Sequence, residues 1–151
     1  MSERLKLKAE EAEDLVILSA TLEGAITSPG EMGYSASNRA FTITASRFMW
    51  ETSDEAQKKR IRTGLYCADV TAVKTSEISR DIPTMAMELL NISCVTKEDG
   101  SAEISLNFAG GGTIRLFAEC VNLTLTDVGD AWKTDHIPFH KEKETTSPSS
   151  S

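Results

Sequence analysis

The sequence predicts one α+β domain: a curled antiparallel sheet of about seven strands, with one helix after the first strand and one C-terminal helix. Three patterns predict this fold class. Apolar residues recur at helical spacing near the N-terminus, strand-like alternation dominates the middle of the chain, and helical spacing returns after the last strand. The 151 residues, of which 40% are hydrophobic and 26% charged, have the size and composition of one globular domain.

The N-terminal part of the chain predicts an edge strand followed by a helix. Leu5 and Leu7 alternate with lysines, as in a short strand. Over residues 11–26 the apolar positions are three or four residues apart: Leu15, Leu18, Leu22 and Ala25. Acidic residues precede this stripe, where the helix dipole favours negative charge. The Ser-Pro-Gly sequence at 28–30 then ends the helix.

Strands are predicted for the next part of the chain. A short strand at 31–34 precedes a longer one, in which apolar and polar residues alternate from Phe41 onward. Phe48 and Trp50 then fall on the opposite face of that strand. Either both faces are covered there, or a β-bulge lies near Ser46–Arg47.

The stretch 60–78 is also strand-like, but it is too long for one straight strand. Strands usually have about 3–10 residues. We therefore expect a bend at Gly64 or at Ala68–Asp69. Another apolar strand is expected over 85–95, ended by the turn residues 97–100.

The clearest signal is a β-hairpin over residues 102–120. Apolar and polar residues alternate over 102–108 and again over 114–120, with Gly110–Gly112 between them. Glycine runs of this kind also expose backbone N–H groups that bind anions in some proteins. Here a strand, not a helix, follows the glycines, so we predict a hairpin loop with at least one glycine at positive φ.

The predicted terminal helix depends on four apolar residues spaced by four, three and four positions: Val121, Leu125, Val128 and Trp132. Gly129 ends or interrupts it. A curled sheet with a C-terminal helix resembles pleckstrin-homology-like barrels, and an open sheet packed by two helices is the alternative. Residues 141–151 lack apolar side chains and are predicted to form a disordered polar tail, which leaves 1–140 as the globular domain.

Charge and cysteine content restrict the class of partner and the compartment. Lys and Arg number 16 and Asp and Glu 23, and the net charge of −7 disfavours nucleic acid and anionic membranes as partners. No apolar run reaches the roughly 18 residues of a membrane-spanning helix, and no signal-peptide pattern follows Met1. The cysteines are odd in number and widely spaced, as expected for free thiols in a cytoplasmic protein: Cys67, Cys94 and Cys120.

Motifs for catalysis, metal binding or cofactor binding are absent from the sequence. Pro138 lies between His136 and His140, the only histidines, and prevents the helical spacing that would bring both rings to one metal. The sequence also has no Gly-x-Ser-x-Gly nucleophile motif. We therefore expect no metal, no cofactor and no catalytic residue, and an enzymatic role is disfavoured but stays open.

Five residues with aromatic or guanidinium side chains are the candidate binding residues: Arg47, Trp50, Arg115, Phe117 and Trp132. Arg115 and Phe117 share the face of the hairpin opposite its apolar stripe. If the terminal helix covers that face, Phe117 packs in the core against Trp132. If it does not, an exposed Phe beside an Arg indicates a protein interface.

Two functional hypotheses follow from these residues. The leading one is a non-enzymatic interaction or assembly module that binds a protein partner or a second copy of itself. The alternative is a small anionic-ligand binder or enzyme, in which Arg47 or Arg115 holds the ligand in a cleft between the sheet and the terminal helix.

Several short segments together form a recognisable signature. They are FAGGGTIRL at 108–116, Glu119–Cys120, DVGDAW at 127–132, RFMWE at 47–51 and the helix start Glu13–Leu15. The chain resembles, over residues 5–140, an uncharacterised domain-of-unknown-function family of small alphaproteobacterial proteins. It departs from that family at Met49, where a basic residue is more usual. The resemblance implies a bacterial cytosolic protein and no particular catalytic activity.

Overall fold

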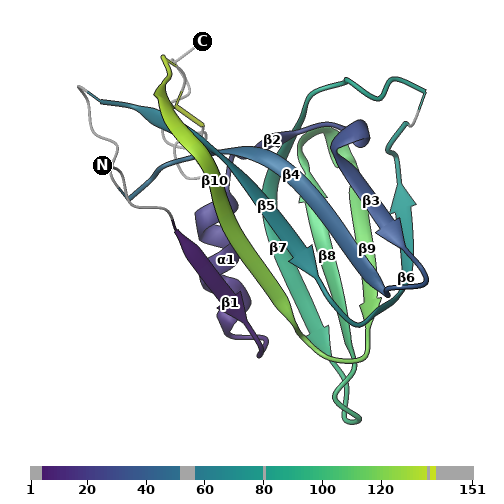
Figure 1. Cartoon of the computed structure of the whole chain (residues 1–151). Helices are drawn as coiled ribbons and strands as arrows, with labels where there is room; N and C mark the ends of the chain where they lie inside the picture. The colour runs from purple at the N-terminus through teal and green to yellow at the C-terminus, as the bar shows by residue number, and fades with distance from the viewer. Residues whose placement is uncertain (1–4, 52–56, 80, 136, 139–151) are drawn as a thin grey trace, which may run out of the picture.

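In the described part of the computed structural model, one antiparallel sheet curls on itself and is packed by one α-helix (Figure 1). The structure describes residues 5–51, 57–79, 81–135 and 137–138. The elements of these residues are, in chain order, β1 Lys6–Ala9, α1 Asp14–Leu22, β2 Ile26–Thr27, η1 Pro29–Glu31, β3 Met32–Ser35, β4 Ala40–Phe48, β5 Lys59–Cys67, β6 Val70–Ser76, β7 Met87–Thr96, β8 Ala102–Phe108, η2 Ala109–Gly111, β9 Thr113–Ala118 and β10 Leu123–Lys133.

The strands form two layers that are joined by β2. The strand order is β1-β10-β5-β4-β2-β7-β8-β9-β6, with β3 beside one end of β4. Ile26 of β2 pairs with both Ser46 of β4 and Glu88 of β7, and this two-residue strand therefore connects the layers. Among the described strands, β1 and β6 end the order with one neighbour each, so the sheet is curled but not closed.

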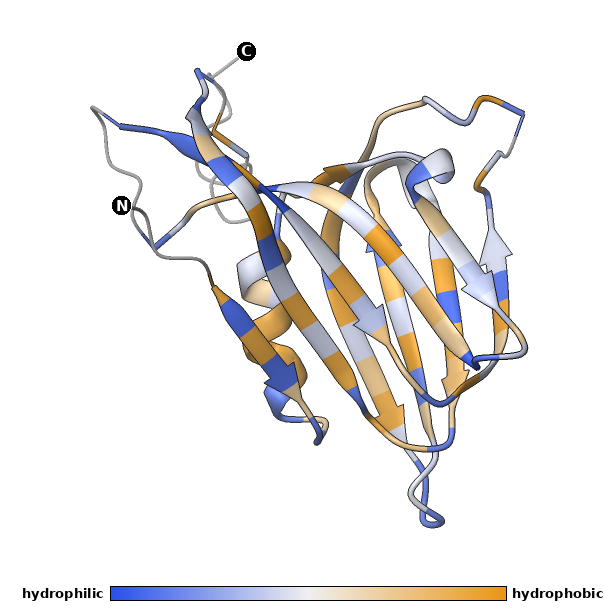
Figure 2. Cartoon of the chain, in the orientation of Figure 1, coloured by the Kyte–Doolittle hydropathy of each residue, from blue (hydrophilic) through white to orange (hydrophobic). Residues whose placement is uncertain are grey.

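Apolar side chains fill the space between the layers. Alternate residues of β8 and β9 are buried, and Ile104 and Leu116 have no exposed surface. Figure 2 shows the same alternation as orange bands between pale and blue ones along the strands. The period-two pattern of the sequence thus directs one face of each strand into a common core.

The helix α1 packs mainly against β7 and also contacts β1 and β4. Its three buried leucines, Leu15, Leu18 and Leu22, belong to the same core as the strands. The Ser19 hydroxyl accepts a hydrogen bond from the backbone N–H of Ile92 at 2.8 Å, which fixes α1 to β7. The predicted helical stripe is confirmed, although the helix is shorter than the stretch 11–26.

Most of the predicted strands are confirmed. The hairpin of β8 and β9 is present, and the long strand-like stretch divides at Ala68–Asp69 into β5 and β6. Asp69 has a φ of 61°, as a tight reversal requires. The pairing of β4 with β5 runs without a shift from Phe41 to Phe48, so no bulge occurs. Both faces of β4 are instead covered at its end, since Arg47 and Phe48 are both buried.

The predicted fold class is wrong in two respects. The chain has ten strands in its described part rather than about seven, and the predicted C-terminal helix is the strand β10. Within β10, buried Leu123 and Leu125 alternate with threonines, and this period of two prevails over the helical spacing of the larger apolar residues. Gly129 (φ 73°) lies where the β10–β5 pairing shifts register, not at a helix end. Neither a pleckstrin-homology-like barrel with its C-terminal helix nor a sheet packed by two helices describes this chain.

Candidate functional site

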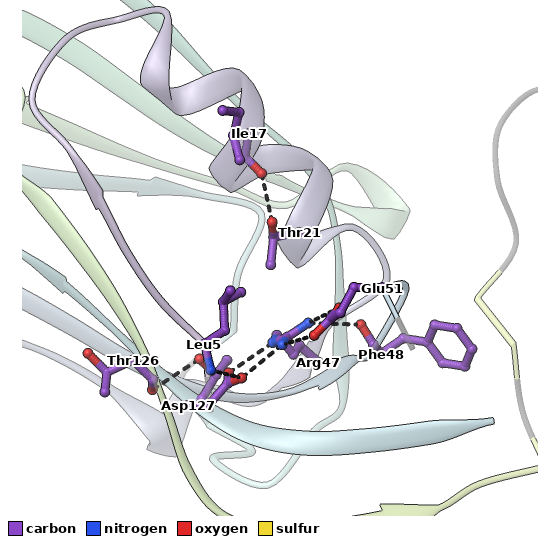
Figure 3. Close-up of polar contacts among 9 residues, drawn as sticks. Leu5, Ile17, Thr21, Arg47, Phe48, Glu51, Thr126 and Asp127 are labelled. Atoms are coloured by element: carbon purple, nitrogen blue, oxygen red, sulfur yellow. Dashed lines mark hydrogen bonds and ion pairs between the residues drawn. The ribbon is translucent and has the colours of Figure 1, made fainter. Parts of the chain in front are cut away.

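Arg47, a predicted binding residue near the end of β4, forms a buried ion pair with Asp127 of β10. Its Nε donates to Oδ1 of Asp127 at 2.9 Å and its Nη2 to Oδ2 at 2.8 Å, and neither side chain has exposed surface. Glu51 accepts from Nη1 at 3.1 Å and from Nη2 at 2.7 Å (Figure 3). Two carboxylates therefore bind one guanidinium.

The same cluster holds the N-terminal end of the described chain. The backbone N–H of Leu5 donates to Oδ2 of Asp127 at 3.1 Å, and the backbone N–H of Asp127 donates to the Leu5 carbonyl at 3.0 Å. Burial alone would raise the pKa of Asp127, but the hydrogen bonds and charge of Arg47 outweigh it and hold this pKa below its usual range. The hydrogen bonds from Arg47 likewise lower the pKa of Glu51.

These contacts favour a structural role for Arg47. The side chain is buried and binds two carboxylates and, at 3.4 Å, the carbonyl of Phe48. With both carboxylates ionised the cluster carries one net negative charge, which repels an incoming anion. The alternative hypothesis placed Arg47 in a cleft beside a terminal helix, and that helix is the strand β10.

The two candidate tryptophans lie just after β4 and on β10. Trp50 follows β4 and contacts Phe48 edge-on, with ring centroids 4.7 Å apart, and its Nε1 donates to the Glu23 carbonyl at 3.1 Å. Trp132 lies on β10 opposite Arg60, with 43% of its surface exposed. Trp132 was expected to pack from the terminal helix over the hairpin face. That helix is the strand β10, so Trp132 does not reach Phe117 in this way.

Arg115 and Phe117 share the outer face of β9, as predicted. Two cations contact the Phe117 ring, with the Arg115 guanidinium 5.9 Å and the Lys74 ammonium 5.6 Å from its centroid. Arg115 donates to Glu103 at 3.1 Å. Lys74 of β6 lies directly opposite Arg115 in the β6–β9 pairing. The outer face therefore carries a small cationic and aromatic patch at the edge of the sheet.

An apolar groove lies between β3 and β6, where the curled sheet stays open; we call it the β3–β6 groove. Its volume is about 420 Å³. The residues that line it include Met32, Tyr34 and Phe41 on the β3 side and Val73, Thr75 and Ile114 on the β6 side. In the described chain, β3 pairs with β4 alone and β6 with β9 alone, so each strand has one unpaired edge. Figure 1 shows the two strands side by side at the right of the view.

Hydrogen bonds between its walls limit the groove at two points. The Tyr34 hydroxyl donates to the Val70 carbonyl at 2.9 Å and so connects β3 to the start of β6. The backbone N–H of Gly30 donates to the Pro83 carbonyl at 2.8 Å and connects η1 to the segment that leads to β7. Both Tyr34 and Pro83 line the groove, so these two hydrogen bonds connect its sides at those points.

Comparison with known proteins gives a family and no activity. Residues 5–140 match a family described as protein of unknown function, DUF2948. The chain belongs to this family. No curated protein and no solved structure matches the chain significantly. The predicted resemblance to a domain-of-unknown-function family is thus confirmed, while the alphaproteobacterial origin stays a prediction.

The glycine loop of this DUF2948 chain has the expected hairpin character. Gly110 and Gly111 have φ values of 89° and 99°, which confirms the predicted positive φ. A Cβ on Gly112 would lie 3.0 Å from Ile78 Cγ1, so the loop also packs closely on the segment after β6. The Glu77 carboxylate lies 3.3 Å from the Cβ position of Gly111. An anion at the loop would face this negative charge, which favours the structural interpretation.

Within the described ranges, no group of three or more His, Cys, Asp or Glu side chains is placed to hold a metal ion. His136 and His140, the two histidines considered in the sequence, and the predicted tail at 141–151 lie outside the described residues. In the described part of the chain, no helix is long and apolar enough to cross a membrane.

The residues of the β3–β6 groove were not among the residues predicted to bind a ligand. Tyr34, Val73 and Thr75 occur in ordinary strand-like segments, and nothing local indicates which strands lie at an edge. One signal was available, because charged residues such as Lys74 are frequent on edge strands. That signal identifies β6 as an edge strand but does not show that β3 lies on the other side of the groove.

Proposed function

We propose that this protein is a non-enzymatic interaction module that binds an extended segment of another polypeptide in the β3–β6 groove. The segment adds a strand to the unpaired edge of β6 and places side chains against the apolar floor. Addition of a strand to an exposed sheet edge is a common mode of peptide recognition, in which backbone hydrogen bonds give affinity and side-chain pockets give specificity.

One observation carries the proposal: two unpaired strand edges border the same apolar groove. An exposed edge is normally shortened, charged or covered, because it invites pairing with other chains. The edge strand β1 follows that rule, since it has four residues and exposes Lys6 and Lys8. β6 has seven residues and turns Val73 and Thr75 toward a groove of about 420 Å³.

The contacts of the candidate arginines support this proposal over the anionic-ligand alternative. Arg47 is buried and binds Asp127 and Glu51. Arg115 is half-exposed and pairs with Glu103. Neither guanidinium faces the β3–β6 groove, whose lining is mostly apolar. We also propose that the protein works in a reducing compartment such as the cytoplasm, because its three cysteines are free.

Selection from a library of displayed random dodecapeptides tests the proposal. The bait is the wild-type protein, and the selected peptides are then measured against two variants, Val73→Glu and Val95→Glu. Both variants add one negative charge. Val73 lines the groove, whereas Val95 is 64% exposed near the end of β7 and does not line it. Urea unfolding of each variant establishes that it is folded before binding is measured.

We expect the selected peptides to bind the wild type and Val95→Glu, and to lose at least tenfold in affinity for Val73→Glu. Equal binding to all three proteins, or no enriched peptide, would overturn the proposal. Analytical ultracentrifugation of the free wild-type protein tests whether a second copy of the chain occupies the groove instead. A dimer that Val73→Glu dissociates would make a second copy of the chain the ligand of the groove, contrary to the proposal.

A further inference from the structure

We infer that the segment bound in the β3–β6 groove alternates apolar with acidic residues, the apolar ones facing the groove and the acidic ones facing solvent beside Lys74. This inference rests on the proposed function and names the chemistry of its partner. Three features of β6 and its neighbour β9 support it.

The two faces of β6 differ in chemistry. Val73 and Thr75 line the groove, while Lys74 between them is exposed on the outer face. A strand that pairs with the free edge of β6 places its residues directly opposite these, on the same faces. Its side chains opposite Val73 and Thr75 therefore enter an apolar space, and its side chain opposite Lys74 stays in solvent.

The outer face carries unbalanced positive charge at that position. Lys74 and Arg115 are cross-strand neighbours, and both contact the Phe117 ring. Arg115 has an ion-pair partner in Glu103. Lys74 makes no ion pair with any residue that the structure describes. An acidic residue of the partner supplies the missing charge, since opposite charges across a strand pair stabilise it.

The same lysine disfavours a second copy of the chain as the occupant. Two β6 strands that pair around this position bring Lys74 opposite its own copy, and like charges directly opposite are destabilising. A second copy also carries the same net charge of −7, which slows its approach at long range.

The net charge repels an acidic peptide at long range as well, so the preference for acidic residues depends on the local contact with Lys74. We expect this preference to weaken as salt screens the exposed Lys74 side chain.

Two labelled peptides test the inference: Ser-Val-Glu-Val-Glu-Val-Ser and its counterpart with Lys in place of Glu, both with blocked ends. Fluorescence anisotropy gives their affinities for the wild type, for Lys74→Glu and for Lys97→Glu. Lys97 is exposed in the turn between β7 and β8, so Lys97→Glu makes the same change of charge away from the groove.

We expect the wild type and Lys97→Glu to prefer the acidic peptide by roughly three- to tenfold, and Lys74→Glu to prefer the basic one. Equal affinities, or a preference that Lys97→Glu reverses as well, would overturn the inference. If both peptides bind the wild type equally and Val73→Glu abolishes the binding of both, the inference fails but the proposed function stands. If no peptide, selected or synthetic, responds to Val73→Glu, the proposed function fails as well.

Discussion

The guanidinium of Arg47 and the carboxylate of Asp127, 80 residues apart in sequence, bind each other side-on through two hydrogen bonds of 2.9 and 2.8 Å. Both side chains are fully buried. Arg47 lies on β4 and Asp127 on β10, with β5 between them in the sheet. Because Asp127 also binds the backbone of Leu5, this pair fixes three segments of one layer to each other.

Removal of the Asp127 charge should destabilise the fold strongly. Asp127→Asn leaves Arg47 buried beside a neutral amide, and we expect the free energy of unfolding to fall by about 3 kcal/mol, because breaking a buried ion pair costs about 3–5 kcal/mol. Glu51 still neutralises part of the charge, which places the loss at the lower end. Urea unfolding monitored by circular dichroism measures it.

Glu51→Gln is the matched control, because it removes a carboxylate from the same guanidinium. The Glu51 side chain is 44% exposed, so water replaces much of what is lost, and we expect a change of about 1 kcal/mol or less. Equal losses in Asp127→Asn and Glu51→Gln would show that burial of the Asp127 pair has no special weight.

Acid should weaken the fold through the same carboxyl. The pKa of Asp127 is lowered in the folded protein, so its contribution to stability is complete above the unfolded value of about 3.9 and is lost as pH falls through the folded value. We expect the urea midpoint to stay nearly constant from pH 7 to about pH 5 and to drop below about pH 4. Asp127→Asn should show a smaller drop over this acid range, and a drop as steep as that of the wild type would contradict the assignment.

The three thiols should differ in reactivity. Burial raises the pKa of Cys67 to about 12. Partial desolvation and the nearby Asp69 carboxylate raise the pKa of Cys120 as well, but its thiol is exposed at the surface. Alkylation of the native protein at pH 8 should modify Cys120 first and leave Cys67 intact until the protein unfolds, because only the thiolate reacts. Mass spectrometry of the timed reaction identifies the sites. Modification of Cys67 as fast as Cys120 would argue against the buried position.

A methyl group on Gly112 should destabilise the hairpin loop. Its Cβ would lie 3.0 Å from Ile78 Cγ1 and 3.2 Å from the Glu77 carbonyl oxygen, so we expect Gly112→Ala to cost about 1–3 kcal/mol. Gly64→Ala on β5 is the control, because no heavy atom lies within 4 Å of its Cβ position. Thermal unfolding compares the two variants, and a Gly64→Ala protein as unstable as Gly112→Ala would remove the packing explanation.

Local patterns in the sequence predicted the helix and most strands, and one pattern misled. The alternation over 102–118 and the leucine stripe of α1 each dominate their segments, so local spacing sufficed. Over 121–132 two periods overlap. The large residues have helical spacing, while Leu123 and Leu125 alternate with threonines, and pairing of this segment with both β1 and β5 selects the strand.

The candidate site was less accessible from the sequence. Arg115 and Phe117 were placed correctly on one face, because they lie within one regular hairpin. Arg47 was a candidate for holding an anionic ligand in a cleft, yet its partner Asp127 lies in another strand and could not be identified from spacing. The β3–β6 groove depends on which strands end the sheet, and that is a property of the topology rather than of any local pattern.

Hydrogen–deuterium exchange, with the tightest peptide from the library selection, tests the central claim most directly. We expect the peptide to slow amide exchange in residues 70–76 of β6, because a bound strand forms new backbone hydrogen bonds at that edge. The edge strand β1, at residues 6–9 and away from the groove, serves as the internal control and should not change. Protection confined to β1 or α1, or unchanged exchange in β6 at saturating peptide, would contradict the proposed function.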